Sequence, residues 1–146
     1  REHGLTDESS PVIVQCFEPT VLDRVATELP VVRILLVGGP DDTPFDGSPS
    51  YGALLSDPTA LRKRVHGLGV HKSAVFDDNG PTGLVEAAHA AGLLVHVYTF
   101  RNEARQLGPA AKGSPAQELA TFYKLGVDGV FADFPDMAAQ VRDAPR

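Results

Sequence analysis

The chain has 146 residues, of which 42% are hydrophobic and 22% charged, a composition typical of a globular domain with an apolar core. Its 13 basic and 19 acidic residues give a formal net charge of -6, which opposes binding to the phosphate backbone of nucleic acids. The longest apolar runs fall far short of the roughly 20 residues of a membrane-spanning helix. The single cysteine, Cys16, excludes a disulfide-stapled fold.

The first part of the chain alternates strand and helix patterns. Residues 12–17 form a β-branched run typical of a strand covered on both faces, and a helix with apolar residues at helical spacing is predicted from Pro19. Residues 31–37 predict a second strand. A segment rich in Asp, Gly, Pro and Ser follows, and we interpret residues 39–56 as a loop insertion.

The alternation continues to the C-terminus. The predicted elements are a short helix that starts after Asp57 and ends at Gly67, a weak third strand at 73–76, a helix from Thr82 to Gly92, a strand at 93–100, a helix capped by Ser114 that ends at Gly126, a strand at 129–134 and a final helix from Pro135. Strands alternating with helices predict an α/β protein with a parallel sheet. The pattern alone does not decide between an open sheet and a barrel, and no glycine-rich phosphate loop follows the first strand.

Three segments together carry a resemblance to a known family. They are residues 12–19 (VIVQCFEP), 89–101 (HAAGLLVHVYTFR) and 126–136 (GVDGVFADFPD). In this order and at these separations they resemble the glycerophosphodiester phosphodiesterase family. The resemblance implies that parallel strand-helix units over residues 1–146 form the C-terminal half of a (β/α)8 TIM-type barrel, as a single partial domain.

The resemblance also implies an activity for the intact protein. The family hydrolyses a glycerophosphodiester to glycerol 3-phosphate and an alcohol, with a divalent metal (Ca or Mg) held by carboxylates and with two histidines as acid and base. In the family these residues lie on the early strands, beginning with a His-Arg-Gly motif that this chain lacks. We therefore expect no catalytic residue and no metal ligand in this chain, and expect it to be inactive alone.

The expected partners follow from the same resemblance. They are the small-molecule glycerophosphodiester and a missing N-terminal half-barrel. The net charge and the short apolar runs predict no nucleic-acid partner and no membrane span. A half-barrel with open strand edges is also expected to self-associate. The resemblance includes exported enzymes, but no secretory signal is visible in this chain, so its localisation stays open.

Candidate substrate-binding residues follow from the barrel, because active sites of barrels lie at the carboxyl ends of the strands. Strand alternation turns Gln15 and Phe17 of the first strand inward, and likewise Tyr98 and Phe100. Phe134 of the last strand completes the expected substrate wall. Asp133 beside it is expected to cap the following helix.

Simpler interpretations hold for several other residues. Cys16 lies in an apolar strand and is interpreted as structural, and so are His89 and His96, which match no local zinc motif. Two alternatives to the phosphodiesterase remain at this point. One is a non-catalytic half-barrel that serves as a binding or interaction module, as a dimer closing eight strands. The other is a different TIM-barrel enzyme that binds phosphate with its last strands.

Overall fold

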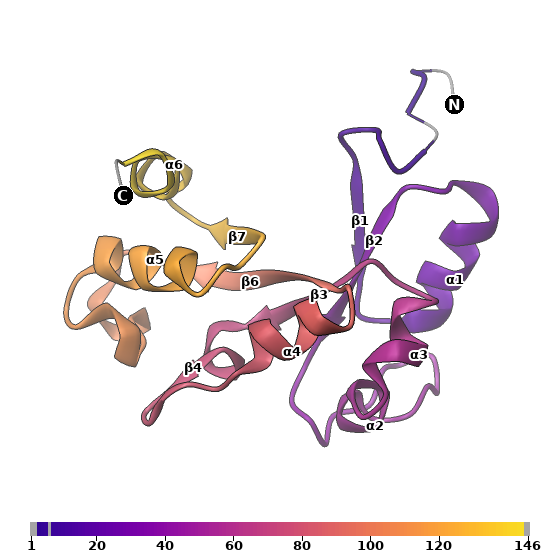
Figure 1. The fold of residues 1–146 in the computed structure, drawn as a ribbon, viewed down its shortest axis with the longest axis horizontal. Coiled ribbons are helices and arrows are strands. Elements are labelled where there is room, and N and C mark those ends of the chain that lie inside the picture. The colour runs from indigo at the N-terminus through magenta and orange to yellow at the C-terminus, as the bar shows by residue number, and fades with distance from the viewer. Residues whose placement is uncertain (1–2, 6, 145–146) are drawn as a thin grey trace. The chain divides into compact units, whose positions relative to one another are not determined.

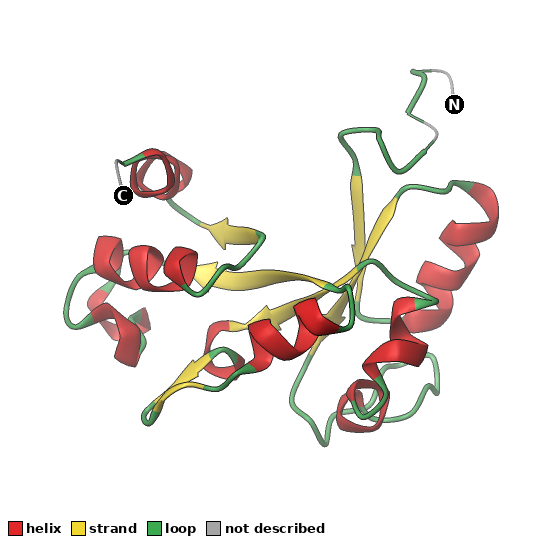
Figure 2. Ribbon diagram, in the orientation of Figure 1, coloured by secondary structure: helices red, strands yellow, loops and turns green. Residues whose placement is uncertain are grey.

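A computed structural model describes residues 3–5 and 7–144. Helices and strands alternate along most of the chain (Figures 1 and 2). The main strands are hydrogen-bonded in the order β1-β2-β3-β6-β7. The elements are β1 (Ile13–Cys16), α1 (Pro19–Glu28), β2 (Val32–Val37), α2 (Tyr51–Leu55), α3 (Pro58–Arg62), β3 (Gly67–His71), β4 (Phe76–Asp77), β5 (Gly80–Pro81), α4 (Leu84–Ala90), β6 (Leu94–Phe100), α5 (Pro115–Lys124), β7 (Gly129–Ala132) and α6 (Pro135–Asp143). The predicted α/β class with parallel strand-helix units is confirmed.

The chain divides into two compact units. The first contains the described residues up to Gly69 together with Ala88–Leu94, and the second contains Val70–Ala87 and the described residues from Val95 onward. In the first unit β1 and β2 pair in parallel, with Ile13 opposite Val32. Its core contains Leu22 of α1 and Ile34 and Leu35 of β2, which are fully buried.

The second unit is built on the parallel pair β6 and β7, in which His96 lies opposite Gly129. Phe122 of α5 is almost fully buried, and its ring packs edge-on against that of Phe100 with centroids 5.0 Å apart. Val95 and Val97 of β6 are also fully buried. The predicted cap of α5 is confirmed, because Ser114 Oγ accepts the N–H of Gln117 at 3.4 Å.

The prediction of a third strand at residues 73–76 is wrong. The strand is β3, and a short 3-10 turn follows it at Lys72–Ala74. Gly67 was interpreted as a helix end, but a Cβ there would lie 2.6 Å from the carbonyl oxygen of Leu94, and one on Gly69 would lie 2.5 Å from Leu36 Cδ2. These glycines are required because the strand backbone packs closely against its neighbours.

The segment predicted as a loop insertion contains a helix. Residues 38–50 are loop, and Ser50 caps α2 by accepting the N–H of Ala53 at 3.3 Å. Tyr51, the first residue of α2, is buried at the base of this loop. The further prediction of one partial domain over residues 1–146 stays a prediction.

Candidate functional site

The carboxyl end of β1 carries two of the predicted substrate residues. Gln15 is half-buried, and Phe17 directly after the strand is 40% exposed. The carbonyl of Phe17 accepts a hydrogen bond of 3.2 Å from the hydroxyl of Tyr51. This contact joins the end of β1 to the base of the loop after β2.

Cys16 lies between these two residues and is not set up as a nucleophile. Its thiol donates to Glu18 Oε2 at 3.0 Å. Burial raises the pKa of the Cys16 thiol, and the hydrogen bond to the Glu18 carboxylate raises it further. Because the thiolate is the reactive form, this environment favours the structural interpretation.

The loop of residues 38–50 is held by carboxylates. Asp42 Oδ2 accepts the N–H of Gly39 at 2.7 Å. Asp46 Oδ2 accepts both the N–H and the hydroxyl of Thr20, at 2.8 and 2.7 Å. Thr20 lies in the first turn of α1, so Asp46 meets free backbone N–H groups at the positive end of a helix. Loss of hydration raises the pKa of Asp46, but hydrogen bonds from Thr20 and Ser48 outweigh it and keep that pKa well below its usual range.

In the second unit, His71 at the end of β3 lies beside the predicted substrate residue Tyr98. Their rings meet edge-on with centroids 5.9 Å apart. Loss of hydration lowers the pKa of His71, and the nearby charge of Lys72 lowers it further. Burial raises the pKa of the Tyr98 hydroxyl. Both side chains are therefore neutral near pH 7, and they form a polar, aromatic edge at two strand ends.

The sequence did not identify His71 as a candidate because the third strand was misplaced. The Gly-Leu-Gly-Val-His run of residues 67–71 contains the signal that was missed, since its last residue is polar and directly follows the apolar positions. Placing a strand on this run would have put His71 at its carboxyl end.

The inward orientation predicted for Phe100 is wrong. Its side chain is only 3% exposed and packs against Phe122 of α5. The pairing of β6 with β7 is irregular between Val97 and Phe100, so simple alternation does not hold at this end of the strand. The structure gives no support for Phe100 as a substrate contact.

Phe134 and Asp133 follow β7. Phe134 is exposed and occupies the N-cap position of α6, which has no side-chain cap. The prediction that Asp133 caps this helix is therefore wrong. Its Oδ2 instead lies 2.9 Å from Nε of Arg101, which directly follows β6, and this ion pair connects the ends of β6 and β7.

A buried ion pair holds the segment between β6 and α5. Nζ of Lys72 lies 3.0 and 3.1 Å from the carboxylate oxygens of Glu118, and it also donates to the carbonyl of Gln106. Glu118 Oε1 accepts the N–H of Gly108 at 2.6 Å. The pair lines a small pocket of about 230 Å³ that also contains His71 and Arg105. This segment follows a strand end, where barrel active sites have their loops.

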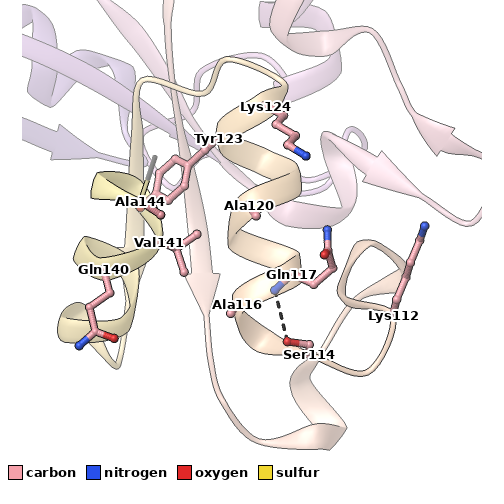
Figure 3. Close-up of a pocket in the computed structure, with 10 residues that line it drawn as sticks. All are labelled: Lys112, Ser114, Ala116, Gln117, Ala120, Tyr123, Lys124, Gln140, Val141 and Ala144. Carbon is pink, nitrogen blue, oxygen red and sulfur yellow. Dashed lines mark hydrogen bonds between the residues drawn. The ribbon is translucent and has the colours of Figure 1, made fainter. Parts of the chain in front are cut away.

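A larger groove of about 890 Å³ lies between α5 and α6 (Figure 3). Its lining combines small apolar residues such as Ala120 and Val141 with lysines, Lys112 and Lys124. Figure 3 also shows the bond from the N–H of Gln117 to Ser114 at the start of α5. The groove lies between helices rather than at strand ends, so it is not the candidate site.

His96 is a structural residue rather than a ligand. Its ring is buried and meets that of Phe131 edge-on at 6.5 Å between centroids. Burial lowers its pKa, an effect that the Asp128 carboxylate partly offsets. Within residues 3–5 and 7–144, no group of three or more His, Cys, Asp or Glu side chains could hold a metal ion.

Strands that alternate with helices, with polar and aromatic side chains at the strand ends, define an α/β protein. The model of the glycerophosphoryl diester phosphodiesterase family matches residues 5–137. The chain therefore belongs to the glycerophosphoryl diester phosphodiesterase family.

Individual relatives agree with this assignment. The chain is 30% identical to glycerophosphodiester phosphodiesterase GDPD6 of Arabidopsis thaliana over 85% of its own length and 36% of the relative's. It is 35% identical to GDPDL1 of the same plant over 64% of the chain and 13% of that relative. The chain thus spans about a third or less of these curated relatives.

A solved structure shows the same fold. It comes from Silicibacter pomeroyi, carries the name glycerophosphoryl diester phosphodiesterase, and superposes with a TM-score of 0.55 at 19% identity over 89% of this chain and 37% of that one. The predicted half of a barrel is thereby confirmed as the fold. No helix in the described part of the chain is both long and apolar enough to cross a membrane.

Proposed function

We propose that the intact protein is a phosphodiesterase that hydrolyses glycerophosphodiesters to glycerol 3-phosphate and an alcohol. The observation that carries this proposal is the family match over residues 5–137, supported by relatives that are named glycerophosphodiester phosphodiesterases. In this proposal the chain supplies part of the substrate wall, at the carboxyl ends of its strands.

The family is generally metal-dependent, but the residues described here do not fit a divalent metal. Ca²⁺ and Mg²⁺ take oxygen ligands that include carboxylates, and within the described ranges no group of three or more His, Cys, Asp or Glu side chains could hold such an ion. The chain sequence also lacks the His-Arg-Gly motif. We infer that the metal ligands and the acid and base belong to another part of the protein, and that this chain alone is inactive.

The proposed substrate residues divide between the two units: Gln15 and Phe17 belong to the first, and Tyr98 and Phe134 belong to the second. Gln15 provides an amide that can donate to or accept from the substrate, and Phe17 provides an exposed aromatic face. Tyr98 is neutral and partly buried, and its hydroxyl can donate a hydrogen bond to a phosphate oxygen. Phe134 is exposed and adds apolar surface.

The proposed partner is an N-terminal half-barrel. β1 and β7 are the end strands of the sheet formed by the described residues. Each carries a large apolar side chain that is exposed, Ile13 on β1 and Phe131 on β7. Exposed strand edges with apolar residues favour pairing with further strands.

The proposed function is tested by comparing the chain alone with the chain joined to its upstream sequence. Release of glycerol 3-phosphate from glycerophosphocholine is measured with Mg²⁺ or Ca²⁺ and again with EDTA. We expect activity from the joined protein only, and its loss in EDTA. Activity of the chain alone would contradict the division of roles, and a stable, inactive two-fold dimer would favour the binding-module alternative.

A further inference from the structure

The small pocket of about 230 Å³ lies entirely within the second unit. It is enclosed by the residues that follow β3 and by the segment between β6 and α5. Apolar side chains such as Phe76 and Leu107 form part of its wall. The pocket thus lies beside the carboxyl ends of two neighbouring strands, where barrel enzymes bind their substrates.

The charged side chains that line this pocket favour an anion. Lys72 and Glu118 balance each other, because Nζ lies 3.0 Å from Oε1. The same carboxylate oxygen accepts the N–H of Gly108 at 2.6 Å, so the negative charge is already compensated within the protein. Arg105 adds a second cation, and among the described residues that line the pocket Glu118 is the only carboxylate. A bound anion is therefore favoured over a bound cation.

His71 lines the same pocket, and its hydrogen bonds fix the tautomer of its ring. The backbone N–H of Ser73 donates to Nδ1 of His71 at 3.2 Å. Because a backbone N–H can only donate, Nδ1 carries no hydrogen in the neutral ring, and Nε2 carries it instead. The hydroxyl of Ser73, 2.8 Å from Nδ1, then also acts as a donor. Neither bond uses the N–H at Nε2, which is the donor that the ring offers to a ligand.

The ring of His71 is held in place and yet accessible. The bond to Ser73 and the edge-on contact with Tyr98, at 5.9 Å between centroids, restrict its rotation. Its side chain is exposed, so a ligand can reach it. Loss of hydration and the nearby charge of Lys72 lower the pKa of His71, which keeps the ring neutral near pH 7. A donor that is already oriented binds a ligand at little entropic cost.

We propose that this pocket binds a phosphate group of the substrate, that the N–H at Nε2 of His71 donates to a phosphate oxygen, and that Arg105 supplies the positive charge. The inference rests on the proposed phosphodiesterase function and deepens it by adding a substrate-binding residue. His71 serves in binding, and the acid and base belong to other residues. Glycerol 3-phosphate, the proposed product, carries the same group and is expected to bind in the same way.

Three substitutions of His71 separate the donor from the other roles of the ring. His71→Asn provides an oxygen that can accept the N–H of Ser73, but its side chain is too short to reach the place of Nε2. His71→Gln reaches that place with an amide N–H and loses the bond from Ser73. His71→Phe keeps a ring beside Tyr98 and loses both hydrogen bonds.

The test is the affinity of the intact protein for glycerol 3-phosphate, measured by isothermal titration calorimetry without turnover. We expect His71→Asn and His71→Phe to raise the Kd by about 10- to 100-fold, as loss of a hydrogen bond to a charged group implies. His71→Gln should raise the Kd less than His71→Phe does. Inorganic phosphate should give the same order of variants, and glycerol, which has no phosphate, should not. The urea midpoint should fall in the Gln and Phe variants and be retained in the Asn variant.

A second pair of variants tests the charge of the pocket. Arg105→Gln should weaken the binding of inorganic phosphate, and more so at low salt, because screening weakens the attraction of an exposed charge. Arg24→Gln is the matched control. Arg24 lies on α1 in the first unit, its side chain is 82% exposed, and its loss should leave the affinity for phosphate unchanged.

The outcomes separate this inference from the proposed activity. If His71→Asn binds glycerol 3-phosphate as the unaltered protein does, or if the Gln and Phe variants lose equally, His71 only caps the turn after β3 and the proposal is overturned. Unchanged phosphate affinity in Arg105→Gln, or no binding by the unaltered protein, would refute the pocket as a phosphate site. If binding depends on His71 but no glycerophosphodiester is hydrolysed, the proposed function fails and the phosphate site stands.

Discussion

Removing the carboxylate of Glu118 is expected to destabilise the second unit strongly. The side chains of Lys72 and Glu118 are only 10% and 1% exposed, so neither charge is screened by water. Glu118→Gln leaves the ammonium of Lys72 buried without its counter-charge, and Lys72→Met leaves the carboxylate in the same situation. Breaking a buried pair from one side costs about 3–5 kcal/mol.

Replacing both partners should be less harmful than the two single changes suggest. In Lys72→Met with Glu118→Leu no charge is left buried. The matching single changes for this comparison are Lys72→Met and Glu118→Leu, each of which leaves one charge buried without its partner. The N–H of Gly108 and the carbonyl of Gln106 then lose their partners, at about 1–3 kcal/mol each. The double variant is therefore expected to lose about 2–6 kcal/mol, against about 6–10 kcal/mol for the sum of the single changes.

The assay is urea denaturation followed by circular dichroism, at about 15 °C, where stability is near its maximum. The exposed pair of Arg24 and Glu28, with side chains 82% and 64% exposed, provides the control. Glu28→Gln should change the free energy of unfolding by no more than about 0.5 kcal/mol. The reasoning fails if the two single losses add up to the loss of the double variant, or if Glu118→Gln behaves like Glu28→Gln.

Three further predictions concern the packing, pH dependence and loop of the chain. Gly129→Ala should cost about 1–3 kcal/mol, because the new Cβ would lie 2.9 Å from Cδ2 of His96; an unchanged urea midpoint would contradict this packing. Burial holds the pKa of His96 below its ordinary 6.5, so the folded protein binds fewer protons than the unfolded chain. The contribution of neutral His96 to stability is present above pH 6.5 and is lost as the pH falls through its lowered pKa. An NMR titration of His96 that gives a pKa of 6.5 or more would contradict this prediction. Asp46→Asn should weaken hydrogen-exchange protection of the Thr20 amide, which donates to the Asp46 carboxylate. In the unaltered chain this protection should persist into strongly acidic solution. The reason is that hydrogen bonds from Thr20 and Ser48 outweigh loss of hydration and keep the pKa of Asp46 well below its usual range.

Most elements could be predicted because their signals are local. Pro19 marks the start of α1 because proline lacks the backbone N–H that would have no partner in the first turn. Ser114 marks the start of α5 because its side chain accepts a backbone N–H of the first turn. The run that became β6 was recognised from its apolar, β-branched composition. β3 was misplaced because the role of its glycines depends on Leu36 and Leu94, which lie far from it in sequence.

The candidate site was predictable only in part, for a related reason. The ends of strands can be located from the sequence. The predicted strands therefore placed Gln15, Phe17 and Tyr98 near a strand end. The direction of Phe100 could not be obtained in this way, because an irregular register near the end of β6 changes which face a residue occupies. The ion pair of Asp133 with Arg101 joins two strand ends that are distant in sequence.

The sequence by itself determined the α/β class, the alternation of strands with helices and, through three motifs, the family. These properties depend on hydrophobic periodicity and capping, which act between near neighbours along the chain. Only the tertiary structure decided that Lys72 and Glu118 form a buried pair and that His71 meets Tyr98. Each of these depends on contacts between distant segments, because the energy of a charge or an aromatic ring depends on what surrounds it in space.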